Sequence, residues 1–230
     1  MKVFRAGTKG AVKVVYWNYG DSVQSDEIRS RLFEKIRLLS DKNLFDPLEI
    51  FQHVSPTKGN ARVEYYTDPL VEPNKGLSAF FKKVNEGLLC FSGNLSWINV
   101  KEGSNPLTRA FERMLERGVS VKILCRIDVA TLKNLHKIES LMRRFPKQVE
   151  IRHCHQPLRG FVADGKLVRL KEEKAKNIFK AKELEKDVRV FYEFSDEVWT
   201  QWLEQVFWYL FRHSIEYEKR EKLLEKFLIK

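Results

Sequence analysis

Helix-like and strand-like segments alternate along the chain after about residue 70, and this alternation limits the fold more than any other feature of the sequence. The helix-like segments carry apolar residues at helical spacing and end near glycine or proline, and they span residues 77–87, 105–118 and 131–145. The strand-like segments are short and rich in apolar residues, and they span residues 88–93, 119–127 and 149–155. A hairpin that turns at Asp164-Gly165 follows. Strands that alternate with helices predict an α/β protein, with α+β as the alternative.

The two ends of the chain differ from this middle part. Residues 1–68 predict an extension of strand, helix, loop and strand, and residues 69–230 are expected to form the main domain. The last segment begins at Ser195, an N-cap candidate, and carries a wide aromatic and aliphatic face. We expect a long aromatic helix that continues towards Lys230, with its apolar face forming core or, alternatively, a dimer surface.

The charge balance favours an anionic partner. The sequence contains 42 Lys and Arg against 31 Asp and Glu, a net charge of +11. The basic excess lies between residues 69 and 191, where it indicates a directed surface or, alternatively, a solvated face of mixed charge. The density of Lys and Glu also suits a heat-adapted protein.

Cysteine usage indicates the compartment. Cys90, Cys125 and Cys154 are widely separated and odd in number, which argues against a disulfide framework and for a reducing environment. The sequence has no secretory pattern and no apolar run long enough to span a bilayer. We therefore predict a cytoplasmic protein that does not enter a membrane.

Several stretches in the middle of the chain resemble the phospholipase D superfamily. A buried strand runs into "FSGNLS", a helix and strand read "LERGVSVKILCR", and "VEIRHCHQPLRGFVADGKLVRLKE" follows. Near the end, "WLEQVFWYLF" is similar to the aromatic-rich helix of that superfamily. The resemblance covers roughly residues 70–212 and is closest to archaeal single-motif members, including TrmB-type regulators. It implies a mixed sheet flanked by helices, and a homodimer, because two motif copies normally meet at one site.

The HxKxxxxD motif of the superfamily carries what this resemblance implies for chemistry. In that motif a histidine attacks the phosphorus of a phosphodiester, a lysine holds the phosphate oxygens, and an aspartate fixes the surroundings of the histidine. Here Arg159 stands at the lysine position and Asp164 at the aspartate position, but Pro157 stands at the histidine position. Proline cannot attack, whereas arginine can hold phosphate bidentately. The resemblance therefore implies a degenerate site that binds phosphate without cleaving it.

His153 and His155 are the alternative nucleophiles. They lie two residues apart on a predicted strand, so they share one face that could point towards Arg159. Together with Asp164 they would be the catalytic residues of a dimeric nuclease or phosphodiesterase. The competing interpretation is one packed and one solvated histidine at a strand end. A pair at this spacing lacks the further ligands that zinc requires, so we predict no metal site and no cofactor.

Basic residues near the histidines predict an anion-binding cluster on adjoining strands. The predicted ligand-binding residues are of types that pair with phosphate: Arg152, Arg159, Lys166 and Arg169. The segment that follows interleaves lysines with glutamates, and it either tracks a nucleic-acid backbone or is an ordinary solvated face. Its lysines are Lys171, Lys174, Lys176, Lys180, Lys182 and Lys186. The turn at Ser92–Asn94 predicts either a ligand-binding loop at a strand end or, more commonly, a plain turn.

These observations predict a non-catalytic binding or regulatory module that recognises a phosphate-bearing ligand, with nucleic acid favoured. The first alternative is the dimeric nuclease or phosphodiesterase that uses His153 or His155. The second is a protein-interaction module that docks a partner chain through the aromatic C-terminal helix, with Trp208 and Tyr209 in the contact.

Overall fold

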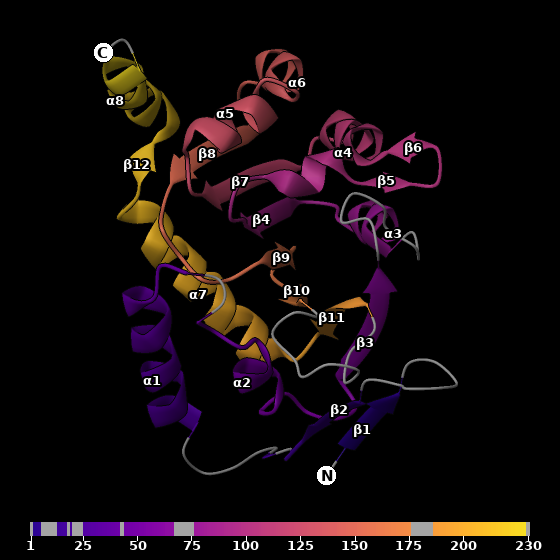
Figure 1. The fold of residues 1–230 in the computed structure, drawn as a ribbon. Coiled ribbons are helices and arrows are strands. Elements are labelled where there is room, and N and C mark those ends of the chain that lie inside the picture. Colours follow the sequence, from indigo (N-terminus) through magenta and orange to yellow (C-terminus); the bar gives the residue numbers. More distant parts are fainter. Residues whose placement is uncertain are drawn as a thin grey trace.

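A mixed sheet of eight strands forms the centre of the protein (Figure 1). The computed structural model describes residues 2–5, 13–17, 19, 25–41, 44–66, 76–175 and 186–228. In sheet order the strands are β12 (Ile215–Glu216), β8 (Val149–His153), β7 (Ser120–Cys125), β4 (Gly87–Phe91), β9 (Gly160–Ala163), β10 (Leu167–Lys174), β11 (Asp187–Phe194) and β3 (Gly59–Tyr66). The predicted α/β class, with a mixed sheet flanked by helices, is confirmed.

The parallel half of the sheet follows from apolar strands joined by helical crossovers. β4, β7 and β8 run parallel to one another, which requires a connection that returns to the same end of the sheet. β4 and β7 are buried along most of their length, as strands covered on both faces are. The helices of this half are α3 (Gly76–Lys82), α4 (Leu107–Glu116), α5 (Val129–Leu135) and α6 (Glu139–Arg144).

The antiparallel half begins with a tight hairpin. β9 and β10 pair with Leu167 opposite Ala163. The Lys166 N–H donates to the Ala163 carbonyl at 2.9 Å, and the two residues enclosed by this bond, Asp164 and Gly165, have φ values of 52° and 62°. Two successive positive φ values are those of a type I′ turn, which Asp-Gly favours, so the predicted hairpin is confirmed. β11 and β3 continue the antiparallel pairing to the sheet edge.

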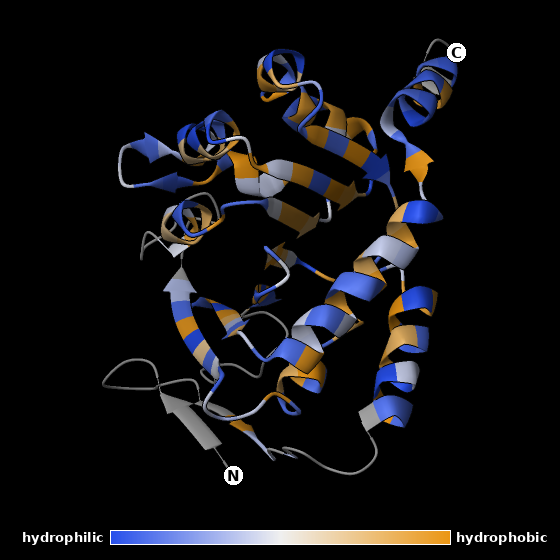
Figure 2. Cartoon of the chain, turned by 180° about the vertical axis from the view of Figure 1, so that it is seen from behind, coloured by the Kyte–Doolittle hydropathy of each residue, from blue (hydrophilic) through white to orange (hydrophobic). Residues whose placement is uncertain are grey.

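Helices cover the other face of the sheet as well. α7 (Glu197–Arg212) crosses this face alongside α1 (Ser25–Leu38), with α2 (Leu48–Phe51) nearby (Figures 1 and 2). Asp196 caps α7, because its carboxylate accepts a hydrogen bond from the Trp199 N–H. The sheet-facing residues of α7 are buried: Trp199, Trp202, Leu203, Val206, Phe207, Leu210 and Phe211. The apolar face of α7 is therefore core.

Two predicted helices are interrupted. The segment 131–145, expected as one helix, forms α5 and α6, which are separated around the fully buried Ile138. The C-terminal helix was expected to continue towards Lys230, but α7 ends at Arg212 and α8 (Tyr217–Leu228) follows. The physical reason is strand pairing. Ile215 in β12 lies opposite His153 and gives β8 a backbone partner on its outer edge.

The N-terminal residues contribute to the main sheet. β3 pairs with β11 along its whole length, from Gly59 opposite Phe194 to Tyr66 opposite Asp187. α1 and α2 share a hydrophobic core with α7. The boundary predicted between residues 68 and 69 thus follows directly after an edge strand of the main sheet.

Shorter elements complete the described chain. β1 (Lys2–Arg5) and β2 (Lys13–Tyr16) form a small antiparallel sheet. A 3₁₀ turn, η1 (Ser96–Asn99), precedes a hairpin whose strands, β5 (Lys101–Glu102) and β6 (Asn105–Pro106), have two residues each. Within the described ranges, no helix has the length and apolar character needed to cross a membrane.

The lysine-rich segment is only partly described. Its first part, to Lys174, belongs to strand β10. Lys171 and Lys174 therefore lie on a strand, whereas Lys176, Lys180 and Lys182 lie outside the described residues.

Asp164 anchors the hairpin to the start of β4, and this anchoring can be tested. Its carboxylate accepts hydrogen bonds from the N–H groups of Asn85, Glu86 and Gly87, at 3.0, 2.9 and 2.9 Å. Burial by itself would raise the pKa of Asp164, but these bonds and the charge of Lys166 hold the pKa below its ordinary value. Asp164→Asn keeps a residue type that tolerates positive φ, and we expect this variant to unfold at a lower urea concentration than wild type near pH 7.

The difference should depend on pH. Because the folded-state pKa lies below the unfolded value of about 3.9, the stabilisation by the carboxylate is complete above that value and is lost as the pH falls through the folded pKa. Urea unfolding of both proteins near pH 7 and near pH 3 measures it. An equal difference at the two pH values would contradict a role for the charge.

Candidate functional site

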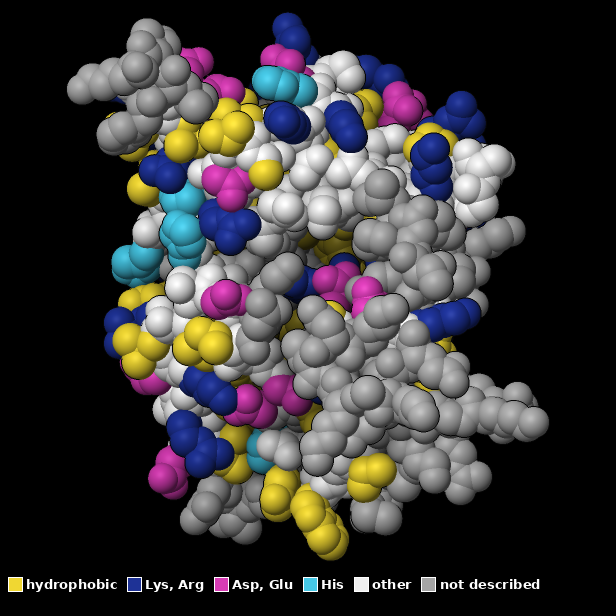
Figure 3. Space-filling view, viewed as in Figure 1, with side chains coloured by type: hydrophobic (Ala, Val, Ile, Leu, Met, Phe, Trp, Pro, Cys, Tyr) yellow, Lys and Arg dark blue, Asp and Glu magenta, His cyan; other side chains and the backbone are white. Residues whose placement is uncertain are grey.

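A cavity of about 490 Å³ opens where the ends of the parallel strands meet the antiparallel hairpin. Residues just after β4 and β7 form one side, the segment between β8 and β9 forms another, and side chains of β10 and β11 form the rest. Figure 3 shows a hollow near the centre of this face of the molecule, with hydrophobic, basic and acidic side chains inside it. The carboxyl ends of parallel strands are where open α/β sheets bind ligands, so the cavity occupies a favourable position for a site.

Apolar side chains form part of the lining. They come from β4, β9, β11 and the adjoining helices: Leu77, Phe91, Trp97, Phe161 and Phe191. Trp97 and Phe161 meet edge to face, with ring centroids 5.8 Å apart. Their burial leaves little room for bulk water at this wall, so charged groups beside it interact more strongly than they would at an open surface.

A partly buried polar cluster in the cavity is organised around the carboxylate of Glu173 on β10. Arg159, just before β9, donates a hydrogen bond to one carboxylate oxygen. The Lys171 ammonium lies 3.1 Å from the other oxygen, and the Arg189 Nε lies 3.5 Å from that same oxygen. The antiparallel register places Glu173 opposite Arg189, so the sheet itself brings this acid and its cations together.

The ionisation of the cluster follows from these contacts. Burial alone would raise the pKa of Glu173, but Lys171 and Arg159 overcome this effect and lower the pKa to about 2. Burial lowers the pKa of the Lys171 ammonium, while Glu173 acts in the opposite direction. Glu173 is therefore an anion at neutral pH, held inside a ring of positive charge.

Arginine side chains also cover the ring of Phe191. The guanidinium carbon of Arg169 lies 4.3 Å from the ring centroid, and that of Arg62 lies 5.2 Å from it. Arg169 also pairs with Glu193 at 3.3 Å, and Arg62 pairs with Glu64 at 2.8 Å. Alternation along β3, β10 and β11 puts these side chains on one face, opposite the face that packs on α7.

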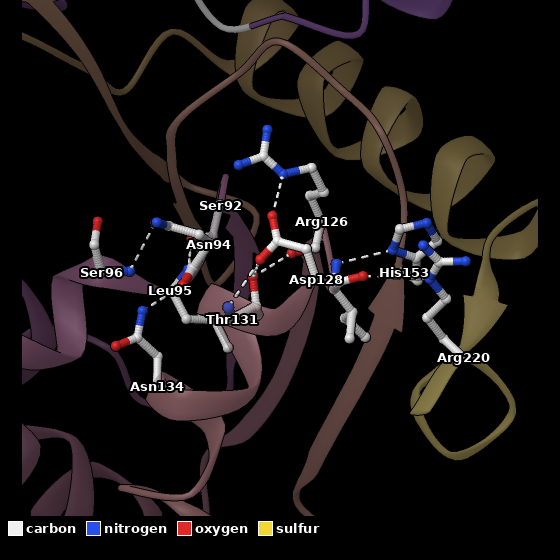
Figure 4. A network of polar contacts seen from close by, with 11 residues as sticks. Ser92, Asn94, Leu95, Ser96, Arg126, Asp128, Thr131, Asn134, His153 and Arg220 are labelled. Atoms are coloured by element: carbon white, nitrogen blue, oxygen red, sulfur yellow. Dashed lines mark hydrogen bonds and ion pairs between the residues drawn. The ribbon is translucent and has the colours of Figure 1, made fainter. Parts of the chain in front are cut away.

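A further arginine, Arg126, lies at the end of β7 beside the turn that follows β4 (Figure 4). Its backbone N–H donates to the carbonyl of Gly93 at 2.7 Å, and its Nε donates to Asp128 at 2.9 Å. Asp128 in turn caps α5 by accepting the N–H of Thr131. Figure 4 shows the Arg126 guanidinium extending beyond Asp128, away from Thr131. Asp128 thus fixes the Arg126 Nε and leaves the terminal nitrogens of the guanidinium at the cavity.

The turn at Ser92–Asn94 lines the same side of the cavity. The hydroxyl of Ser92 accepts the N–H of Leu95 at 3.0 Å, and the side chain of Asn94 accepts the N–H of Ser96 at 3.2 Å. Both polar groups therefore stabilise the loop itself. The two interpretations of this segment are both met in part, because it is a self-bonded turn that also borders a cavity.

The two histidines have different environments. His153 is 7% exposed, and its Nδ1 accepts the N–H of Ile127 at 2.8 Å. Burial, with Arg220 next in effect, lowers the pKa of His153 to about 4. His155 lines the cavity, whereas His153 does not. The two rings are neighbours, with their centroids 5.0 Å apart. Of the two predicted nucleophiles, only His155 faces the site.

The structure brings only two of the four predicted basic residues to the cavity. Arg159 and Arg169 line the cavity, but Arg152 and Lys166 do not. Arg152 alternates to the α7 side of β8, where its guanidinium pairs with Glu150 and stacks on Phe211. Lys166 follows the turn at the far end of β9 from Arg159.

Asp164 also lies away from the cavity. It follows the last residue of β9, while Arg159 precedes the first, and its carboxylate is occupied by the backbone at the start of β4. The structure therefore does not bring Asp164 together with His155 and Arg159 at the cavity. Its role in this chain is to hold the hairpin.

Four charged residues of the cavity lining were missed from the sequence: Asp41, Arg126, Glu173 and Arg189. Charged residues at alternate positions of β10 were a usable signal, because Arg169, Lys171 and Glu173 must share one face of a strand. Interleaved charge instead left two interpretations of this segment, a nucleic-acid contact and a solvated face. Arg189 is brought to Glu173 only by the strand register, for which the sequence carried no comparable signal.

Cysteine and metal chemistry add little to the site. Cys154 lines the cavity, and burial raises the pKa of its thiol to about 11, which keeps it protonated at neutral pH. Cys90, Cys125 and Cys154 are all free thiols. In the part of the chain that the structure describes, no three or more His, Cys, Asp or Glu side chains gather as metal ligands.

Comparisons with known proteins give similar structures but no sequence match. No model of a known protein family matches the chain, and no curated protein does. Among solved structures, TrmBL2, an archaeal chromatin protein described as having a novel mode of DNA binding, matches with a TM-score of 0.49 and 14% identity. That match covers 84% of this chain but 65% of TrmBL2, slightly under two thirds.

Two other solved structures match over almost their whole length. Nuc from Salmonella typhimurium, a phospholipase D family member, matches with a TM-score of 0.47 and 13% identity over 70% of this chain and 99% of Nuc. NucT from Helicobacter pylori matches with a TM-score of 0.47 and 10% identity over 70% of this chain and 100% of NucT. The resemblance predicted from the sequence thus has counterparts among solved structures. At these scores the likeness carries no argument about activity or ligand.

The buried position of His153 leads to a direct test by NMR. We expect its ring to stay neutral where exposed histidines titrate, near pH 6.5, and to take up a proton only near pH 4. Since the unfolded state binds that proton more readily, His153 should lower the stability of the fold as the pH falls from about 6.5 towards 4.

The measurement is a titration of the histidine ring signals, with His153→Gln to assign them. A His153 signal with a midpoint near 6.5 would contradict the buried, hydrogen-bonded arrangement.

Proposed function

We propose that this protein is a non-catalytic binding or regulatory module that recognises a phosphate-bearing ligand, a nucleic acid, in the cavity. The observation that carries the proposal is the charge of the cavity lining. Among the described residues the lining contains five basic and two acidic side chains, Arg126, Arg159, Arg169, Lys171 and Arg189 against Asp41 and Glu173.

Arginine suits this role for a geometric reason. Its guanidinium presents five N–H donors in a rigid fork, which is more than one carboxylate can use. Arg126 engages Asp128 through its Nε, and in the described part of the chain its terminal nitrogens have no hydrogen-bond acceptor. Arg159 donates to Glu173 through one terminal nitrogen. A phosphate at the cavity would thus meet guanidinium donors already oriented by an acid on the protein.

The aromatic lining supports a nucleotide over inorganic phosphate alone. Phe161, Phe191 and Trp97 border the same space as the arginines. Bases stack on aromatic side chains and on arginine in sequence-tolerant single-strand binding. A volume of about 490 Å³ is within the usual range for small-ligand pockets. The cavity would therefore hold one nucleotide of a longer strand.

Pro157 supports binding without cleavage. A phosphodiesterase of the resembled type needs an imidazole where this chain has Pro157, and the proline ring carries no group that can attack phosphorus. A homodimer remains a prediction from the resemblance. The face of α7 that packs on the sheet is buried, whereas Tyr209 is exposed, so docking of a partner chain through this helix also stays a prediction.

The proposal predicts that charge at the cavity determines affinity. We expect Arg126→Ala and Lys171→Met each to weaken the binding of a labelled single-stranded oligonucleotide by about tenfold, about 1.4 kcal/mol. Arg126 is half-exposed and Lys171 leaves Glu173 with two other cations, so both variants should fold. Fluorescence anisotropy measures the affinity.

Lys133→Ala is the matched control, because it removes one exposed charge on α5 away from the cavity. Equal affinities for wild type, both cavity variants and the control would contradict the proposal. Incubating the same oligonucleotide with wild type, with and without a chelator, should leave it intact.

A second candidate function, hydrolysis of a phosphodiester, is favoured by one observation. His155 borders the cavity that also contains Arg159. If this histidine were a nucleophile, wild type would cleave the oligonucleotide or a chromogenic phosphodiester, and His155→Ala would abolish that cleavage. Such a result would replace the non-catalytic proposal.

A further inference from the structure

A second hollow lies between α3, α4 and the β5–β6 hairpin, which are neighbours in Figure 1. Its volume is about 450 Å³, and none of its lining residues belongs to the cavity described above. Four of its lining side chains are basic and one is acidic: Lys82, Arg109, Arg113 and Arg117, and Glu102. We call this hollow the α3–α4 groove.

Charge is segregated on the surface of α4. Arg109 and Arg113 are both exposed and lie four residues apart, so they stand one above the other on the same side of the helix. Glu112 and Glu116 form a separate acidic row, and Arg144 of α6 pairs with both. The acids of α4 are thus neutralised on the side of α6, while its bases face the groove. An ordinary mixed-charge helix surface would not be divided in this way.

Glu102, the one acid that the described residues contribute to the lining, is directed elsewhere. Glu102 is 4% exposed, and its Oε1 accepts the N–H groups of Leu77 and Ser78 at 3.0 and 2.9 Å. This carboxylate caps the first turn of α3. It is therefore occupied by the backbone and does not form an ion pair with the arginines of the groove among the described residues.

Arg117 differs from the other basic residues of the groove because its side chain donates hydrogen bonds to the protein backbone. One terminal nitrogen donates to the carbonyls of Phe81 and Val84, at 2.9 and 2.8 Å, which ties the end of α3 to the end of α4. Lys82, Arg109 and Arg113 form no ion pair or side-chain hydrogen bond within the described ranges. Three cations are thus gathered at a concave surface that supplies no counter-charge from the described chain.

We infer that the α3–α4 groove is a second anion-binding surface and that it binds the phosphate backbone of a nucleic acid. Residues four apart on a helix are separated by about 6 Å along its axis, so Arg109 and Arg113 present regularly spaced charges to a partner with regularly spaced anions. Positively lined clefts concentrate such partners and speed their encounter. The inference goes beyond the proposed function, because it holds whether or not the cavity binds a nucleotide.

The test is the salt dependence of DNA binding. Each cation that contacts a phosphate contributes about 0.9 to the slope of log affinity against log salt for a duplex, and about 0.7 for a single strand. We expect the double variant Arg109→Ala/Arg113→Ala to lower the slope by about 1.8 with a labelled duplex or by about 1.4 with a labelled single strand, and to weaken binding on the order of tenfold near 0.15 M salt. Fluorescence anisotropy across a potassium chloride series measures both quantities.

Matched variants separate this surface from net charge and from the cavity. Lys133→Ala/Lys147→Ala removes two exposed charges elsewhere and should leave the slope nearly unchanged, whereas Arg109→Lys/Arg113→Lys should restore most of it. Thermal unfolding checks that each variant is folded. A lower salt slope of DNA binding in Arg109→Ala/Arg113→Ala, together with wild-type affinity in Arg126→Ala, would support the groove as an anion-binding surface. The same result would contradict the proposal for the cavity.

Three outcomes would overturn the inference. The first is an unchanged slope in Arg109→Ala/Arg113→Ala. The second is an equal loss of slope in the control variant, which would indicate net charge alone. The third is a result of competition with polyglutamate, added so that its carboxylates equal the DNA phosphates in concentration. If polyglutamate abolishes DNA binding by wild type but not by the groove variant, the groove is a surface for acidic protein segments.

Discussion

The carboxylate of Glu173 is the centre on which the polar face of the sheet depends. Charges removed from water must be paired, and this one acid accepts contacts from Arg159, Lys171 and Arg189. The contacts join the start of β9 to β10 and β11, so the wall of the cavity is fixed by electrostatics as well as by the strand ladder. The same sheet is apolar on its other face, where α7 packs. One face therefore provides stability and the other provides a charged surface.

The position of the cavity follows from the change of strand direction in the sheet. β4, β7 and β8 are parallel, and β9 is antiparallel to β4, so the loops at the ends of the parallel strands face the segment that enters the hairpin. Arg126 and the Ser92–Asn94 turn come from the first set, and His155 and Arg159 come from the second. Asp164 keeps the two halves in register from the opposite end of β9 through its bonds to the start of β4.

Local signals in the sequence predicted local structure well. Asp164-Gly165 predicted its turn because two positive φ values favour this pair, and the apolar strands and amphipathic helices of the middle region were recognisable by their periodicity. The features that failed depend on partners distant in sequence. α7 ends where β12 finds β8, and the predicted binding group of Arg152, Arg159, Lys166 and Arg169 divides because two of these side chains face away from the cavity. Glu173 was indistinguishable from a solvated glutamate until the register with β11 set it opposite Arg189.

Removing the charge of Glu173 tests the account most directly. Glu173→Gln leaves three cations around a neutral amide, so thermal unfolding without phosphate should occur at a lower temperature than in wild type. Inorganic phosphate that occupies the cavity stabilises the folded state by mass action. The account predicts that added phosphate raises the midpoint of both proteins and raises that of Glu173→Gln more. Midpoints that respond to phosphate no more than to potassium chloride of equal ionic strength, in both proteins, would contradict an anion-binding cavity.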